Sequence, residues 1–253
     1  MVPRSERAAD VREMVMAHDM FRREFGLMPD LVRAVAPGDR ARLDIVAGHV
    51  ELIVLVLGRH QHGEDTEMWP RLLDRVPEGD RPLVRVMQEQ HGPLDDLVVE
   101  LAVALGEWRD ESAADAREAV GAVAATAARE RLAGTLDLVN AALREHLADE
   151  ERLVLPLIEQ YVTAAEWEQM VQAEADATPP DSVALIFGML MYEADPLVVE
   201  AIIGGMPPEV RPVLKQVAEG AYAAHAKRVH GTGTPPRIGV EQRRNSGVAG
   251  AGV

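Results

Sequence analysis

The sequence predicts an all-α protein: an up-and-down four-helix bundle with a C-terminal helical extension. Hydrophobic residues make up 47% of the 253 residues, whereas aromatic residues make up only 4%. Ala, Leu, Val, Glu and Arg dominate, and alternating polar and apolar runs typical of strands are scarce, so helices are favoured. Long segments with helical periodicity are separated by short breaks rich in Pro, Gly and Asp, which is the pattern of an antiparallel bundle.

The four bundle helices are expected within residues 1–162. The first begins near Ser5, and Gly26 and Pro29 end or bend it. Pro93 lies inside the third helix, where it predicts a kink. The expected segments are, in chain order, residue 5 to the Gly26–Pro29 bend, residues 40–75, residues 82–108, and a segment from the polar break at 109–115 to about residue 161.

A helical appendage is expected over residues 163–230. Thr163 and Glu166 have the spacing of a capping box that opens its first helix. Two or three further helices, punctuated by Gly and Pro, are expected between 182 and 230. From 231 to 253 the chain is rich in Gly, Pro and Arg and has little apolar content, which predicts a disordered tail.

Charge and cysteine content exclude several classes of function. The formal net charge is −16, and such a surface repels nucleic acid and anionic lipid. The chain has no cysteine, so thiolate metal sites, iron–sulfur clusters, thiol catalysis and disulfides are excluded. The first residues show no apolar signal region, and the most apolar run, residues 50–57, is too short to span a bilayer. We therefore expect a cytoplasmic protein that binds neither nucleic acid nor membrane.

One local pattern occurs twice and carries the strongest functional signal. Each copy has a histidine, a glutamate four residues later and a proline six residues after that. On a helix, positions i and i+4 lie on the same face, so each copy directs an imidazole and a carboxylate to one spot. Two facing copies would supply nitrogen and oxygen ligands suited to a pair of iron or manganese ions inside a bundle. The copies are His60–Glu64–Pro70 and His146–Glu150–Pro156.

Two further histidines, His18 and His91, fall inside the helical patterns of the first and third segments. No histidine has a glutamate three residues before it, which argues against the Glu-x-x-His arrangement of ferritin-like bundles. With the two repeated elements, these histidines make the chain resemble hemerythrin-like proteins of the HHE cation-binding type over residues 5–160. The resemblance implies two non-heme iron ions joined by an oxo or hydroxo bridge, with Glu64 and Glu150 bridging. It implies terminal ligation by His18, His60, His91 and His146.

The chain departs from the oxygen-carrying members at one position. Those proteins have a second histidine four residues after the first on the third helix, where this chain has Asp95. A site short of one histidine has an added carboxylate ligand or an open position, and an open position favours reaction over reversible O₂ transport. We expect binding of, or reaction with, O₂, peroxide or nitric oxide, possible oxidoreductase activity and a possible homo-oligomer. The alternatives are an oxygen or redox sensor, and metal storage or a structural metal.

Several other titratable residues leave more than one interpretation open. Glu67 shares the face of His60 and is an added ligand, a hydrogen-bond acceptor behind the ligands or a solvated acid. Asp95 either fills the missing ligand position or is solvated. His49 lies about 16 Å from His60 along the helix, which favours packing or a hydrogen bond. Surface or packing roles are favoured for His62, His225 and Tyr222, and solvent exposure for His230.

Overall fold

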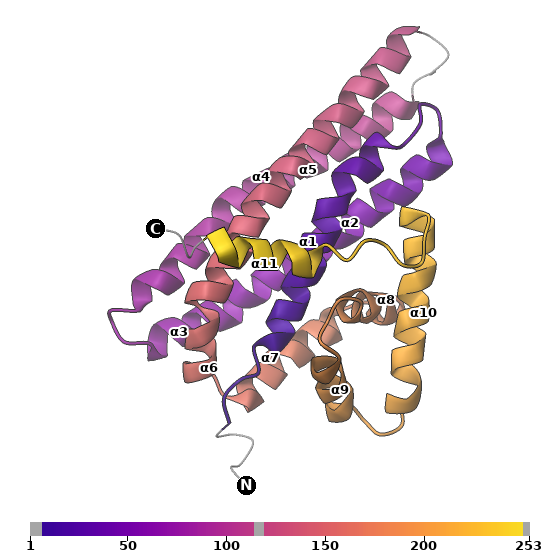
Figure 1. Ribbon diagram of the computed structural model, residues 1–253. Helices are drawn as coiled ribbons and strands as arrows, with labels where there is room; N and C mark the ends of the chain where they lie inside the picture. Colours follow the sequence, from indigo (N-terminus) through magenta and orange to yellow (C-terminus); the bar gives the residue numbers. More distant parts are fainter. Residues whose placement is uncertain (1–6, 114–118, 250–253) are drawn as a thin grey trace.

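The computed structural model describes residues 7–113 and 119–249 and confirms the all-α prediction (Figure 1). Its described part contains no strand, only an isolated bridge between Ala8 and Thr163. The bundle consists of α1 (Arg12–Arg33), α2 (Arg40–Gly63) continued by η2 (Glu64–Met68) and α3 (Trp69–Arg75), α4 (Arg81–Ala113), and α5 (Ala119–Leu153) continued by α6 (Leu155–Tyr161). None of the described helices is both long and apolar enough to cross a membrane.

The C-terminal segment adds five helices to one side of the bundle. They are α7 (Ala164–Ala177), α8 (Pro180–Met191), α9 (Pro196–Gly205), α10 (Arg211–His230) and α11 (Gly239–Ala249). The predicted capping box is present at the start of α7, where the Thr163 side chain accepts from the backbone N–H of Glu166. In Figure 1, α8, α9 and α10 lie together beside the bundle, and α11 runs across α1 and α5.

Pro29 does not end the first helix, which continues to Arg33. Proline removes one helical hydrogen bond, but Met28 and Val32 on either side of it are fully buried in the bundle core. Tertiary packing thus outweighs the local preference. The expected start at Ser5 lies outside the described residues, and the described helix α1 begins at Arg12. The expected polar break at 109–115 is wrong for residues 109–113, which α4 includes, and residues 114 and 115 lie outside the described residues.

The prediction of a disordered tail is wrong for residues 231–249. The backbone there passes so close to α1 that a Cβ on Gly239 would lie 2.0 Å from the carbonyl oxygen of Asp19. Arg243 Nε donates to Asp19 Oδ1 (2.9 Å), and Tyr192 Oη donates to the carbonyl of Pro235 (2.8 Å). These polar and backbone contacts hold a segment whose composition has no apolar pattern, which is why composition alone suggested disorder.

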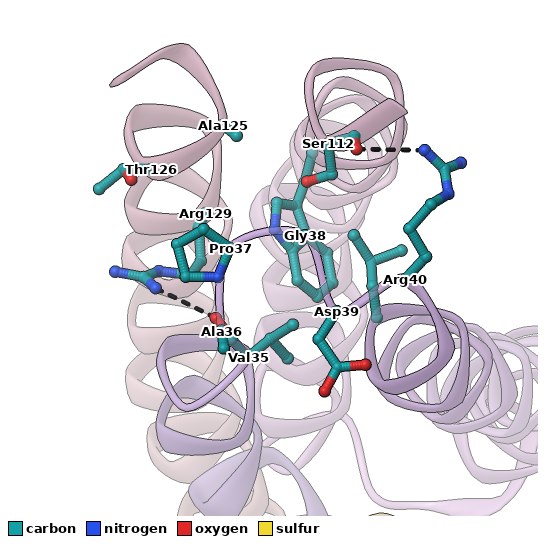
Figure 2. A pocket seen from close by; sticks show the side chains of 12 residues that line it. Val35, Ala36, Pro37, Gly38, Asp39, Arg40, Ser112, Ala125, Thr126 and Arg129 are labelled. Carbon is teal, nitrogen blue, oxygen red and sulfur yellow. Dashed lines mark hydrogen bonds between the residues drawn. The ribbon is translucent and has the colours of Figure 1, made fainter. Parts of the chain in front are cut away.

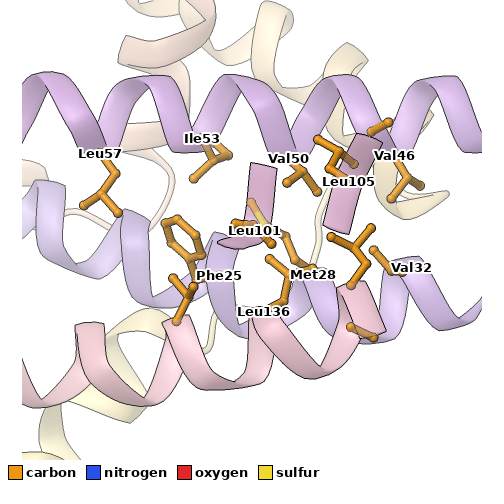
Figure 3. Packing of buried hydrophobic residues seen from close by; sticks show 14 of the residues in the cluster. Phe25, Met28, Val32, Val46, Val50, Ile53, Leu57, Leu101, Leu105 and Leu136 are labelled. Atoms are coloured by element: carbon orange, nitrogen blue, oxygen red, sulfur yellow. The ribbon is translucent and has the colours of Figure 1, made fainter. Parts of the chain in front are cut away.

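The main core lies between α1, α2, α4 and α5 (Figure 3). Phe25 of α1 faces Ile53 and Leu57 of α2, Met28 of α1 faces Val50 of α2, and Leu136 of α5 lies on the opposite side of the layer. Fully burying a side chain of this size stabilises the fold by about 1.5–3 kcal/mol. The bundle part of this cluster extends from the loop that joins α1 to α2 toward the histidines described below.

The middle of α1 is buried on nearly every side, including its charged face. Asp19, Arg22, Arg23 and Glu24 are all buried, because α8 and α11 cover the side of α1 that faces away from the bundle. Arg23 donates to Glu24 Oε1 (2.7 Å) and to the carbonyl of Met189 (2.9 Å). The charged face of α1, which its composition would place in solvent, is therefore buried beneath the C-terminal segment.

Candidate metal centre

Each repeated His-x₃-Glu element stands just before an interruption of its helix. After His60, the helix passes through the π-helical turn Glu64–Met68, and Pro70 lies in the first turn of α3. After His146, α5 ends at Leu153 and Pro156 lies in the first turn of α6. Proline suits a first turn because its missing N–H needs no helical partner there. The repeated prolines thus mark where each helix restarts beyond its ligands.

The six predicted site residues meet in the interior of the bundle. They fall into two groups, and within each group one candidate ligand atom per residue lies within 4.8 Å of all the others. Glu64 belongs to both groups, so the groups adjoin. One group is His18, His60, Glu64 and Glu150, and the other is Glu64, His91 and His146.

The carboxylate of Glu64 lies between two histidines from different helices. Its Oε1 is 3.1 Å from His60 Nε2, and its Oε2 is 3.3 Å from His91 Nε2. Its two oxygens therefore face different imidazoles, as those of a bridging carboxylate do.

Glu150 has a similar place on the opposite helix. Its Oε2 lies 3.3 Å from His18 Nε2 and 3.9 Å from His146 Nε2. Both oxygens of Glu150 are buried and have no hydrogen-bond partner among residues 7–113 and 119–249, and the same holds for Nε2 of all four histidines. Buried polar atoms rarely stay without a hydrogen-bond partner, so this convergent set of nitrogen and oxygen atoms fits a bound cation.

Three of the imidazoles are oriented through their other ring nitrogen. His18 Nδ1 contacts Glu151 Oε1 (2.9 Å), and His91 Nδ1 contacts Asp65 Oδ1 (3.0 Å). His146 Nδ1 donates to Gln90 Oε1 (3.1 Å). Such partners set the tautomer and turn Nε2 toward a metal.

Sequence reasoning missed these orienting residues, although a signal for two of them exists. Asp65 directly follows Glu64, and Glu151 directly follows Glu150, so each repeat carries two consecutive acids. The second acid of each pair reaches a histidine on another helix. Nothing in local spacing identifies Gln90, which lies on α4 and contacts His146 of α5.

The pKa values of the histidines shift in different directions, so their protonation states differ. Burial, followed by the nearby His18, lowers the pKa of His60 to about 3, and burial lowers the pKa of His146 to about 4. Burial also opposes the charge on His18, but Glu150 and Glu151 outweigh it and raise its pKa to about 9. His60 and His146 are thus neutral near pH 7, as metal ligation requires, whereas a cation must displace a proton from His18.

Glu67 and Asp95 are not part of this cluster. Both are exposed, and Glu67 pairs with Arg71 on the helix surface (2.8 Å). The seven-residue spacing from His60 predicts a shared face only for an unbroken α-helix; the intervening π-turn shifts that register. Asp95 is one α-helical turn beyond His91 but exposed, so it does not replace the missing histidine. His62 is exposed as expected.

A pocket at the far end of the bundle lies away from these histidines (Figure 2). It lies where the loop between α1 and α2 meets the end of α4 and the start of α5, and its volume of about 20 Å³ holds roughly one water molecule. Arg129 donates to the carbonyl of Val35 (3.2 Å) and Arg40 to that of Ser112 (3.1 Å), which closes this end. The pocket has no part in the His–Glu cluster.

A helical bundle that encloses four histidines and two glutamates defines a metal-binding protein. The hemerythrin HHE cation binding domain model matches residues 9–158, more than half of the chain, and the protein belongs to that family. The resemblance predicted from the two repeats, His18 and His91 is therefore confirmed. No curated protein and no solved structure matches significantly.

Proposed function

We propose that this protein holds two non-heme iron ions and uses them to bind or react with O₂, peroxide or nitric oxide. The observation that carries the proposal is the overlap of the two ligand groups at Glu64. His18 and His60 would serve one ion, and His91 and His146 the other, with Glu64 and Glu150 between them. Nitrogen and carboxylate oxygen ligands without thiolates suit iron or manganese.

The residues present fit such a pair of ions. The buried Nε2 atoms and the Glu150 oxygens lack hydrogen-bond partners in the described part of the chain, so metal ligation would satisfy them. The exposed side chain of Asp95 supports a set of four histidines, which leaves a position for a small molecule. When bound, the iron pair would supply the electron exchange with that molecule.

The chain's own residues have two tasks at such a centre. Glu151, Asp65 and Gln90 hold the imidazoles in orientation. Trp69 and Phe21, both almost fully buried, pack beside His91 and His60 and exclude water. Within its described surroundings the His60 side chain is 14% exposed, against 4% or less for the other three histidines. His60 is therefore the most exposed of the four histidines, although its Nε2 atom is buried.

A sensing role is the second candidate, and contacts of the C-terminal segment favour it. Asp19, next to His18, accepts from Arg243 of α11 (2.9 Å). Glu151 contacts both His18 and Arg22 (2.7 Å). Arg22 also lies 3.6 Å from Asp19, so a change at the centre would reach α11 through three ion pairs in series. The cytoplasmic location expected from the sequence stays a prediction.

Iron content and the near-ultraviolet and visible spectrum test the proposal. After loading with Fe(II) and exposure to air, the full chain is expected to show the absorption of a coupled iron pair. Glu150→Ala should lose at least one iron per chain and that absorption, whereas Glu145→Ala, at an exposed position of α5, should match the wild type. Unchanged iron content and spectrum in Glu150→Ala, with helical content retained, would refute the bridging role.

Added peroxide separates the two candidates. Rapid gas release supports an enzyme that consumes peroxide. A reversible change of colour with O₂, without turnover, supports a carrier or sensor. For the sensor, Arg243→Ala should alter the response of α11 to oxidation, measured by protease sensitivity, while the iron content stays the same.

A further inference from the structure

A second group of buried ligand atoms lies away from the proposed iron centre. Glu24 of α1, His49 of α2 and His230 at the end of α10 each direct one atom to a common point, and these three atoms lie within 4.8 Å of one another. Glu24 Oε2 is 3.2 Å from His49 Nε2 and 3.6 Å from His230 Nε2. His49 and His60 are about 16 Å apart along α2 by helical rise, so the two clusters cannot share an ion.

The three atoms are buried and poorly satisfied by the protein. The side chains of Glu24 and His49 have no exposed surface, and that of His230 is 5% exposed. Within the described parts of the chain, none of Glu24 Oε2, His49 Nε2 and His230 Nε2 has a hydrogen-bond partner. Their only contacts at this point are the ion-pair contacts of Glu24 Oε2 with the two imidazoles, so a carboxylate oxygen and two ring nitrogens converge where a cation would satisfy all three.

The other oxygen of Glu24 is firmly held. Oε1 accepts from Arg23 Nε (2.9 Å) and Nη2 (2.7 Å) and from Tyr222 Oη (3.0 Å). These three donors fix the plane of the carboxylate and leave Oε2 directed at the two imidazoles. Arg23 also pairs with Glu193 (3.2 Å). The guanidinium divides its charge between two carboxylates, so part of the negative charge on Glu24 is left for another cation.

The imidazole of His49 is oriented in the way typical of a metal ligand. Its Nδ1 lies 3.1 Å from Nε2 of His225. In the tautomer with the proton on His49 Nδ1, this nitrogen donates to His225, and the Nε2 lone pair faces Glu24. His230 is positioned from its own helix end, because Arg42 of α2 donates to the carbonyls of Arg228 (2.6 Å) and Val229.

We propose that Glu24, His49 and His230 form a second, mononuclear site for a divalent transition-metal ion. Two imidazole nitrogens and one carboxylate oxygen are a recurrent set for zinc and for non-heme Fe(II). Ligands at about 2.0–2.2 Å from one ion lie roughly 3–4 Å apart, which agrees with the separations of 3.2 Å and 3.6 Å. The ion joins α10 to α1 and α2, so it fastens the C-terminal segment to the bundle.

Titration of the metal-free full chain with Co²⁺ tests this site, with bound ions counted and the visible absorption of tetrahedral Co²⁺ recorded. Glu24→Gln and His230→Ala are each expected to bind one ion fewer than the wild type. His230 is the last residue of α10, so its replacement leaves the helix intact. His62→Ala removes an exposed histidine of α2 and should bind as the wild type does.

Combining variants separates this site from the iron centre. Glu150→Ala should retain the ion that His230→Ala removes, and the double variant should lose it. If Glu150→Ala loses no ion, the proposed function fails while the count in His230→Ala still decides the second site. Wild-type stoichiometry and absorption in both Glu24→Gln and His230→Ala, with helical circular dichroism retained, would overturn the second site.

Discussion

The two buried His–Glu clusters differ in how the chain assembles them. The cluster around Glu64 uses bundle helices alone, and four of its six residues come as two pairs four residues apart. The cluster around Glu24 takes one residue from each of three helices, and α10 lies outside the bundle. Local spacing reveals ligands only when two of them share a helix. The cluster around Glu64 therefore needs only the bundle helices, whereas the cluster around Glu24 also needs the C-terminal segment to pack against the bundle.

The largest expected effect comes from forcing α10 away from α8. A Cβ on Gly188 would lie 2.1 Å from the backbone oxygen of Ala218, so Gly188→Val must separate the two helices. Overpacking of this kind costs about 1–3 kcal/mol. We expect a lower melting temperature and loss of the ion at His230, with the ions at Glu64 retained, as measured by Co²⁺ titration.

Gly204→Ala is the matched control, because a Cβ there meets no atom within 4 Å. Alanine in a helix is favoured over glycine by roughly 0.5–1 kcal/mol, so this variant should be slightly stabilised. If Gly188→Val lost the ions at Glu64 and kept the ion at His230, the proposal that only the site at His230 depends on the packing of α10 would be wrong.

An intermediate effect is expected at the start of the C-terminal segment. Thr163→Ala removes the cap of α7, where Thr163 Oγ1 accepts from Glu166 N (3.3 Å), and should cost about 1 kcal/mol. Both metal clusters lie outside α7, so the ion count should not change while the urea midpoint falls. In the control Thr126→Ala, the lost hydroxyl donates only to the carbonyl one turn back (2.8 Å), and the midpoint should stay. A lost ion in Thr163→Ala would show that α7 supports a cluster.

The smallest effect is the acid dependence of the ion pair between α3 and α7. Arg75, with the backbone N–H of Thr163, lowers the pKa of Glu166 from its usual 4.5 to about 2. The folded state thus binds the proton less readily, so the pair stabilises it above about pH 4.5, and the benefit disappears as the pH falls toward 2. Since the pair is partly exposed, the gain is below about 1 kcal/mol and is screened by salt.

Urea unfolding of the wild type and Glu166→Gln across this pH range measures the contribution. The difference between their midpoints should shrink as the pH falls and should also shrink when salt is added at pH 7. A difference that is independent of pH would contradict a stabilising contribution from the charge of Glu166.

The sequence predicted the bundle and the six clustered residues because both depend on short periodicities. Helical spacing identifies the apolar faces, and the repeated His-x₃-Glu pairs identify residues that share a face. His18 and His91 were added through their place in those patterns. Asp65 and Glu151 were missed because a second consecutive acid looks like an ordinary solvated residue.

The surroundings of α1 could not be predicted for a different reason. Arg23 and Glu24 are charged, and only the covering helices decide whether such residues face water. The same holds for His230, which was expected to be exposed and lies 5% exposed beside Glu24. The order of residues 231–249 depends on contacts such as Arg243 with Asp19, which join positions far apart in the chain.

The helix breaks after Glu64 and Glu150 have a mechanical consequence. In an unbroken helix, a small displacement of the backbone that carries a carboxylate also displaces the helical turns beyond it. The π-turn before Pro70 and the restart before Pro156 uncouple the two glutamates from the segments that follow. We therefore expect the two carboxylates to follow a change in ionic radius, or in the separation of two cations, while α3 and α6 beyond the breaks keep their positions.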